Sequence, residues 1–247
     1  SVMTVSGGAE FQCNTNVATS DAGAGGCMFV QKLLQRNTIS VTGIGTRVKI
    51  NGNQAYRGAG VSLIGSTMMV SAGAAVQCQN NNASDGGCMY LQENSLLSAT
   101  GNNTHAVFNK NVAKGRGGGL LAFKSSTVEI DNAATLTFSD NKAQTGGGMG
   151  TDQSAVSVSG QNSLLVLEKN QAALNGGGLT GKDGSSVAVK AGGTIKAMDN
   201  IARDNGGAMF LFAQGSSLVV TGEDSYLEIS NNTAEQKSGG GIAVAEG

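Results

Sequence analysis

The sequence has no proline, no tryptophan, a single histidine and only 4% aromatic residues. Because proline cannot donate a backbone hydrogen bond, a chain without it is suited to uninterrupted sheet pairing. No apolar run approaches the roughly 20 residues of a membrane-spanning helix, so we expect no direct insertion of this segment into a membrane. The net charge of −1 leaves no basic excess, which argues against nucleic acid as a partner.

Glycine, in contrast, is abundant at 39 residues. The glycines lack the every-third-residue spacing of collagen, and an apolar content of 39% is too high for a disordered linker. An Asn that is followed two residues later by an Ala, and shortly afterwards by a Gly-rich triplet, occurs eight times, at steps of 28 to 37 residues. A repeat of this size predicts an array of one small unit. The repeated asparagines are Asn16, Asn53, Asn81, Asn111, Asn141, Asn170, Asn200 and Asn232.

Each unit also contains short segments in which apolar and polar residues alternate. Alternation is clear in STVEI (126–130), AVSVSG (155–160), SVAVK (186–190) and SLVVTG (217–222). A period of two, rich in Val, Ile and Thr, is typical of strands. Three short strands per repeat predict an all-β fold, a parallel β-helix of about eight coils, in which each strand pairs with its counterpart about 4.8 Å away.

The repeat predicts a structural role for each of its recurring residues. We expect the eight asparagines to form an internal ladder, each adopting a left-handed turn and pairing its amide with the coils above and below. The Ala two residues later is expected in a corner without room for more, and the glycines where the chain bends with positive φ.

Two positions of the unit vary together. The residue three before the Asn is Cys13, Ile50, Cys78, Phe108, Phe138, Leu167, Ala197 and Ile229. The third residue of the triplet is Cys27, Gly60, Cys88, Gly119, Gly148, Gly178, Ala208 and Gly241. Large residues thus accompany Gly, Ala accompanies Ala, and Cys accompanies Cys. Because core volume is conserved, these positions are expected to face each other across the coil.

This pairing predicts two disulfides within single coils, Cys13–Cys27 and Cys78–Cys88. The alternative is four buried free thiols that pack as small apolar residues. A metal site is less favoured because His105 is the only histidine, and we expect no cofactor. Disulfides indicate an oxidising compartment.

Two segments, FNKNVAKGRGGGL and FSDNKAQTGGGM, resemble the repeats of the chlamydial polymorphic outer membrane proteins. Those repeats carry F-x-x-N and G-G-A-[I/L/V] motifs. Here the first motif is intact at Phe108–Asn111 and Phe138–Asn141, and Gly206–Met209 is the nearest match to the second. The resemblance implies a right-handed parallel β-helix displayed outside the cell, as an adhesin or the surface passenger of an autotransporter. Similar repeats occur in large extracellular proteins of protists and algae, so the source stays open.

Three N-x-S/T sequons begin at Asn82, Asn102 and Asn231. They permit glycosylation if the source is eukaryotic, although matches of this kind arise readily by chance in a chain so rich in Asn.

β-Helices also carry polysaccharide-active enzymes, so the carboxylates of this chain are candidates for a catalytic site. The residues before four successive ladder asparagines are Lys110, Asp140, Lys169 and Asp199, which predicts an alternating ladder of surface charges. Asp140 and Asp199 could form a carboxylate pair of the kind glycosidases use, but Lys169 would lie between them. We therefore expect no catalytic residues. Asp152, Glu223 and Asp224 are interpreted as ordinary solvated loop carboxylates.

The sequence favours a non-enzymatic structural or adhesive protein of the cell surface or extracellular space, an adhesin or a filament component. Its partners would be a protein or glycan at a surface, or neighbouring copies of itself, contacted through the variable loops, which are longest at 19–24 and 235–238. The alternative is a lyase or glycosidase whose site lies in missing coils or loops. We expect residues 1–247 to be one β-helix domain, an internal part of a longer protein, because solenoids need caps and neither end resembles one.

Overall fold

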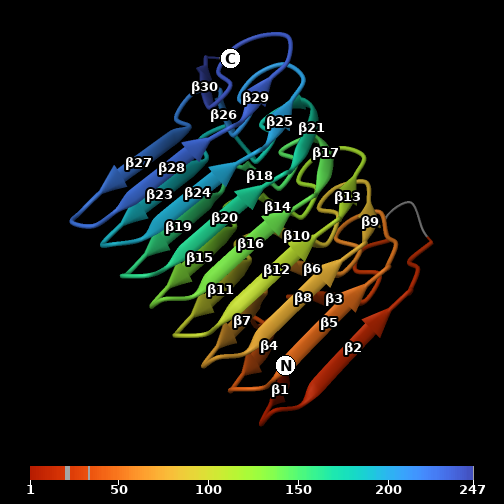
Figure 1. The fold of residues 1–247 in the computed structure, drawn as a ribbon. Coiled ribbons are helices and arrows are strands. Elements are labelled where there is room, and N and C mark those ends of the chain that lie inside the picture. The colour runs from red at the N-terminus through yellow and green to blue at the C-terminus, as the bar shows by residue number, and fades with distance from the viewer. Residues whose placement is uncertain (20–22, 33, 247) are drawn as a thin grey trace.

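The computed structural model describes residues 1–19, 23–32 and 34–246, and every regular element in this part of the chain is a β-strand. Strands of successive coils lie side by side, from red at the N-terminal end to blue at the C-terminal end (Figure 1). They form three eight-stranded sheets and one of six strands. The predicted all-β parallel β-helix of about eight coils is therefore confirmed.

Each coil contributes one strand to each long sheet. Sheet 1 contains β1 (Val2–Ser6), β4 (Thr38–Thr42), β7 (Thr67–Ser71), β11 (Leu96–Thr100), β15 (Thr127–Asp131), β19 (Ala155–Ser159), β23 (Ser186–Lys190) and β27 (Ser217–Thr221). Sheet 2 contains β2 (Glu10–Asn14), β5 (Arg47–Asn51), β8 (Ala75–Gln79), β12 (His105–Asn109), β16 (Thr135–Ser139), β20 (Leu164–Glu168), β24 (Thr194–Met198) and β28 (Tyr226–Ser230). Sheet 3 contains β3 (Met28–Gln31), β6 (Val61–Ile64), β10 (Met89–Gln92), β14 (Leu120–Phe123), β18 (Met149–Asp152), β22 (Leu179–Lys182), β26 (Met209–Phe212) and β30 (Ile242–Ala245).

The fourth, shorter sheet lies between sheets 2 and 3 along the chain, and we refer to it as the corner sheet. It contains β9 (Asn82–Ala83), β13 (Val112–Ala113), β17 (Lys142–Thr145), β21 (Gln171–Asn175), β25 (Ile201–Ala202) and β29 (Thr233–Ala234). All pairings are parallel, and the long sheets keep a constant register, as where Phe108 of β12 pairs with Phe138 of β16. Equivalent residues of the repeat therefore stack directly above one another.

The core is made by the inward-facing half of each alternating strand. Val128 and Ile130 of β15 are fully buried, whereas Glu129 between them is exposed. Phe108 and Phe138 are also fully buried, and their rings stack with centroids 4.5 Å apart. Burying a side chain of this size contributes roughly 1.5–3 kcal/mol, so the inward rows supply much of the stability of the stack.

The left-handed residue at the ladder corner is not the one predicted. The backbone takes positive φ at the residue before each ladder Asn, for example 52° at Lys110 and 54° at Asp140, and not at the Asn itself. The Asn has to keep a conformation that points its amide along the stack. The predicted positive φ does occur in the Gly triplets, at their first member, as at Gly117 with φ 64°.

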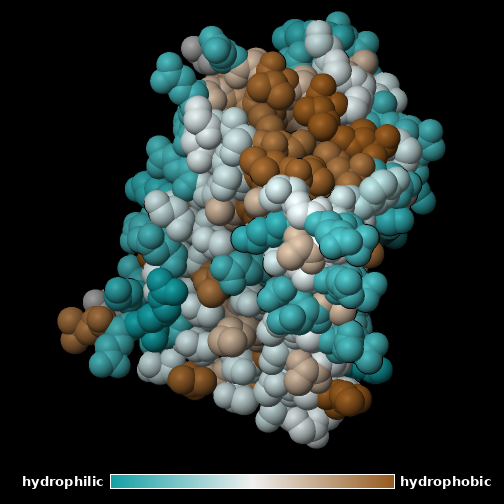
Figure 2. Space-filling model, turned by 90° about the vertical axis from the view of Figure 1, so that its left-hand side faces the viewer, coloured by the Kyte–Doolittle hydropathy of each residue, from teal (hydrophilic) through white to brown (hydrophobic). Residues whose placement is uncertain are grey.

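Apolar side chains gather at the C-terminal end of the stack, where β27, β28 and β30 lie (Figure 2). Val220 and Val244 pair in register with buried Val189 and Leu211 of the preceding coil, yet are 43% and 71% exposed. They continue the inward rows of the core.

Candidate functional site

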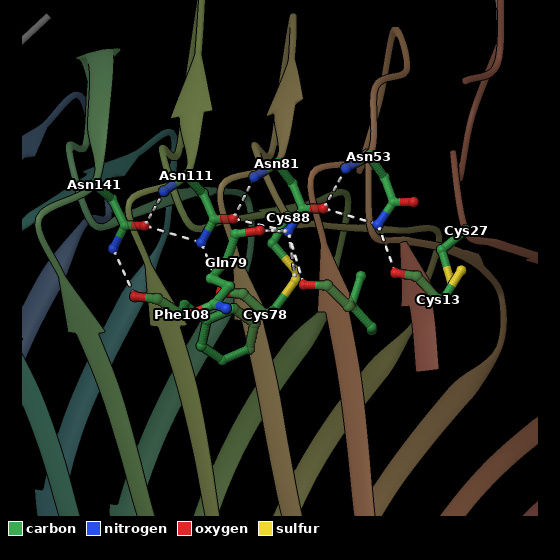
Figure 3. The surroundings of a disulfide bond; sticks show 11 residues. Cys13, Cys27, Asn53, Cys78, Gln79, Asn81, Cys88, Phe108, Asn111 and Asn141 are labelled. Carbon is green, nitrogen blue, oxygen red and sulfur yellow. Dashed lines mark hydrogen bonds between the residues drawn. A yellow bond between two sulfur atoms is a disulfide. The ribbon is translucent and has the colours of Figure 1, made fainter. Parts of the chain in front are cut away.

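The ladder asparagines form a continuous hydrogen-bonded column (Figure 3). From Asn53 to Asn232, the Oδ1 of each accepts from the backbone N–H and from the Nδ2 of the Asn in the preceding coil, at 2.9–3.0 Å. The Nδ2 also donates backward, as from Asn111 to the carbonyl of Cys78 at 3.0 Å. From Asn53 to Asn200 these side chains are fully buried. Because every donor and acceptor is satisfied, the column fixes coil register instead of costing free energy.

A second polar column, which the sequence analysis did not identify, lies at the corner between sheets 3 and 1. Backbone N–H groups donate to the hydroxyl of the next coil, from Ser66 to Ser95 at 3.2 Å and from Ser95 to Ser126 at 3.3 Å, continuing to Ser154 and Ser185. These serines recur at steps of 28 to 31 residues, so a signal was present in the sequence. The column joins one coil to the next at this corner.

The structure joins Cys13 to Cys27 and Cys78 to Cys88, with Cα atoms 5.9 and 6.2 Å apart (Figure 3). Two further pairs also face each other within a coil, Ile50 with Gly60 and Ile229 with Gly241. At Gly119 the nearest side chain is instead Phe138 of the next coil. A Cβ added to Gly60 would lie 2.9 Å from Cγ2 of Ile50 in the same coil. Disulfides are typical of oxidising compartments and indicate a location outside the cytoplasm.

The predicted ladder of alternating charges is present, but its neighbouring charges do not form ion pairs. Lys110, Asp140, Lys169 and Asp199 do follow one another in successive coils at the left-handed position, and all four are exposed. Within the part of the chain that the structure describes, no ion pair within 4.0 Å joins any two of them. Lys169 lies in the row between the two aspartates, so they do not share a cleft as a catalytic pair would.

A cluster of charges lies instead on the outer side of sheet 3, around Arg116 of the row that immediately precedes the Gly triplets. There Arg116 contacts Asp152 through Nη1 and Oδ2 at 2.6 Å, and Asp85 through Nε and Oδ1 at 3.8 Å. Asp152 is only 6% exposed and ends strand β18, so its interpretation as a solvated loop carboxylate is wrong. Glu223 and Asp224 are exposed, in the segment between β27 and β28. The sequence could not identify the ion pair because its partners are 36 residues apart and occupy different rows of the repeat.

The same face carries most of the aromatic contacts. The guanidinium of Arg57 lies 5.4 Å from the ring centroids of Tyr56 and Tyr90, and that of Arg116 lies 5.4 Å from Phe123. Burial raises the pKa of the Tyr90 phenol above its usual value. Further along sheet 3, the rings of Phe210 and Phe212 stack at 5.8 Å.

A cavity of about 110 Å³ opens on this face over β14, β18, β22 and β26. It exists because the outward row that holds Tyr90, Leu121 and Phe210 in other coils holds Gly150 and Thr180 here. The lining residues are Arg116, Leu121, Thr145, Gly150, Thr151, Asp152, Asn175, Thr180, Lys182, Phe210 and Phe212. Asp152 is the one carboxylate among them, whereas hydrolysis of a glycosidic bond uses two. The enzyme alternative therefore gains no support from this cavity.

The remaining predicted positions lie at the surface. Asn82, Asn102 and Asn231 are all exposed, in β9, in a turn between sheets 1 and 2, and beside ladder residue Asn232 respectively. The loop 235–238 is exposed and held by an ion pair between Lys237 and Asp204 at 2.8 Å. In the loop 19–24, residues 20–22 lie outside the described residues. His105 is exposed, and its Nδ1 lies 3.1 Å from the carbonyl of Asn103.

No group of three or more His, Cys, Asp or Glu side chains is placed to hold a metal ion in the part of the chain that the structure describes. Nor does the described chain include any helix whose length and apolar character would let it span a membrane.

Comparison with known proteins supports the resemblance seen in the repeats. No protein-family model matches the chain, and no solved structure is significantly similar. The probable outer membrane protein pmp20 of Chlamydia pneumoniae is 30% identical over 129 residues, which is 51% of this chain and 7% of that protein. The probable outer membrane protein PmpA of Chlamydia muridarum is 28% identical over 121 residues, 44% of this chain and 12% of that protein. The chain thus spans only a small part of these relatives, and over about half of its own length it is similar to chlamydial polymorphic outer membrane proteins.

Proposed function

We propose that this chain is a non-enzymatic part of a cell-surface β-helix, which binds through the sides of the stack. The observation that carries the proposal is the similarity to two proteins named as probable outer membrane proteins. The two disulfides support it, because they are suited to an oxidising environment.

The geometry favours binding over catalysis. Most special residues of the repeat, the asparagines and the corner serines, are used to stack one coil on the next. What varies from coil to coil is the segment before the Gly triplet, which holds Arg57, Asp85, Arg116 and Asn175. A rigid scaffold with a variable face is the usual arrangement of a recognition solenoid. The partner would be a protein or glycan at a surface, or a neighbouring copy of the chain.

Surface location can be tested by labelling intact cells that produce the protein with a membrane-impermeant amine reagent. Lys110, Lys142 and Lys169 are exposed and would react. The expected result is equal labelling before and after cell lysis, while a cytosolic control protein is labelled only after lysis. Labelling of the chain only after lysis would contradict the proposal.

A further inference from the structure

The cavity over β14, β18, β22 and β26 combines an apolar wall with a few polar groups. Leu121 and Phe210 are buried, at 0% and 7% exposure, and Phe212 is half-buried beside them. Phe210 and Phe212 alternate with inward-facing Met209 and Leu211, so both rings project from the outer side of the sheet. We propose that this cavity is a carbohydrate-binding subsite for one uncharged pyranose ring of a glycan. This assignment rests on the proposed surface-binding function.

The polar groups at the cavity offer both acceptors and donors. The Oδ2 of Asp152 accepts a hydrogen bond from Nη1 of Arg116. Within the described residues, no hydrogen bond is made to its Oδ1. The Oδ1 of Asn175 accepts from the backbone N–H and the Nδ2 of Asn205, at 3.1 and 2.9 Å, which leaves the Asn175 amide as a donor. A sugar hydroxyl donates and accepts at once, so a neighbouring acceptor and donor match it.

Charge and size select the occupant. Arg116 is paired with Asp152, and Lys182 with Asp183 at 3.1 Å, so the charges at the cavity are compensated within the chain. A phosphate or an acidic peptide would find no free cation there. The volume of about 110 Å³ is also below the roughly 300–1,000 Å³ of pockets for drug-sized ligands. An apolar surface with a few oriented polar groups is the usual composition of a small-ligand site. The C–H face of a pyranose would lie on the Phe210–Phe212 wall, with its hydroxyls toward Asp152 and Asn175.

Two substitutions remove the site by different means. Phe212→Ala removes part of the stacking wall. Thr180→Leu fills the cavity with the residue that the repeat itself carries at the equivalent position of β14, Leu121. Phe29→Ala is the matched control, because Phe29 is an aromatic residue of the same sheet, 50% exposed and absent from the cavity lining.

The probes are methyl pyranosides of neutral hexoses and N-acetylhexosamines, each observed by saturation-transfer difference NMR with the purified chain. A sialic acid glycoside and inorganic phosphate serve as charged comparators. At least one neutral pyranoside is expected to receive saturation from the wild type and from the Phe29→Ala variant, and to bind at least tenfold more weakly to Phe212→Ala and Thr180→Leu. Circular dichroism checks that all variants keep the β-fold.

The proposal is overturned if no neutral pyranoside gives a signal with the wild type, if only the charged probes do, or if the signal is the same in all four proteins. These outcomes would leave the surface-labelling result untouched. A chain found at the cell surface without sugar binding refutes the subsite alone, whereas a chain absent from the surface refutes the proposed function.

Discussion

At the scale of single residues, stability depends on a few polar side chains that would be costly to bury alone. The side chain of an interior ladder Asn, such as Asn53, replaces water with two backbone groups and two neighbouring amides, so six of the eight can lie fully buried. Identity and spacing alone predicted these residues, because each repeat needs the same amide at the same corner. Their backbone conformation was not predictable, since Asn tolerates both conformations.

Asn81 and Asn82 provide a direct test, because they are adjacent but only Asn81 is in the ladder. Asn81→Ala would leave the backbone N–H of Asn53 and the carbonyl of Ile50 without their side-chain partners. We expect a loss of about 2–4 kcal/mol in unfolding free energy. Asn82→Ala removes an exposed side chain and should cost no more than about 0.5 kcal/mol. Urea unfolding followed by circular dichroism measures both, and equal losses would show that the ladder is not stabilising.

Because Tyr90 is buried, the unfolding free energy of the protein is expected to depend on pH in the alkaline range. Its phenol has a raised pKa in the folded protein because it is buried, so the folded state keeps the proton longer than the unfolded state. Its contribution is present below the unfolded pKa of about 10 and is lost as pH rises through the folded value. The decrease in unfolding midpoint between about pH 8 and about pH 10.5 should be smaller in Tyr90→Phe than in wild type. An identical decrease in both proteins would argue against this role.

At the scale of the element, the Gly triplet decides how closely the coils approach. Its first residue has positive φ, whereas its second faces the backbone of the next coil, so each glycine serves a different need. Alternation and glycine clusters were sufficient to predict the strands and turns. The corner strands of only two residues, such as β9 and β13, were not predicted, because two residues show no periodicity.

The middle glycine can be tested against its own equivalent. A Cβ at Gly118 would overlap the carbonyl oxygen of Gly147 in the next coil, while at Gly240 the nearest atom is the Asn232 carbonyl oxygen at 3.1 Å. Gly118→Ala should therefore destabilise the chain by about 1–3 kcal/mol through overpacking. Gly240→Ala should cost clearly less. Thermal unfolding of the two variants checks this, and similar midpoints would contradict the close approach of the coils at Gly118.

At the scale of the whole molecule, stacking of equivalent residues explains both the stability and the freedom of the surface. The inward rows and polar columns repeat, whereas the row before the Gly triplets changes from Arg57 to Asp85, Arg116 and Asn175. The sequence predicted the stack because repetition is visible along the chain. It did not predict the Arg116–Asp152 pair or the cavity, since both depend on which different rows meet on one face.

The central claim is a parallel β-helix in this coil register, located outside the cytoplasm, and disulfide mapping tests both parts together. The protein is isolated from cells that produce it, alkylated without reduction and digested with trypsin. The tryptic peptide that ends at Lys32 contains both Cys13 and Cys27, and another, 58–110, contains both Cys78 and Cys88.

We predict that each peptide is found unlinked, unalkylated and lighter by two hydrogens than its reduced form, since each disulfide lies within one coil. A covalent link between the two peptides would contradict the register. Four alkylated cysteines would contradict the oxidising location.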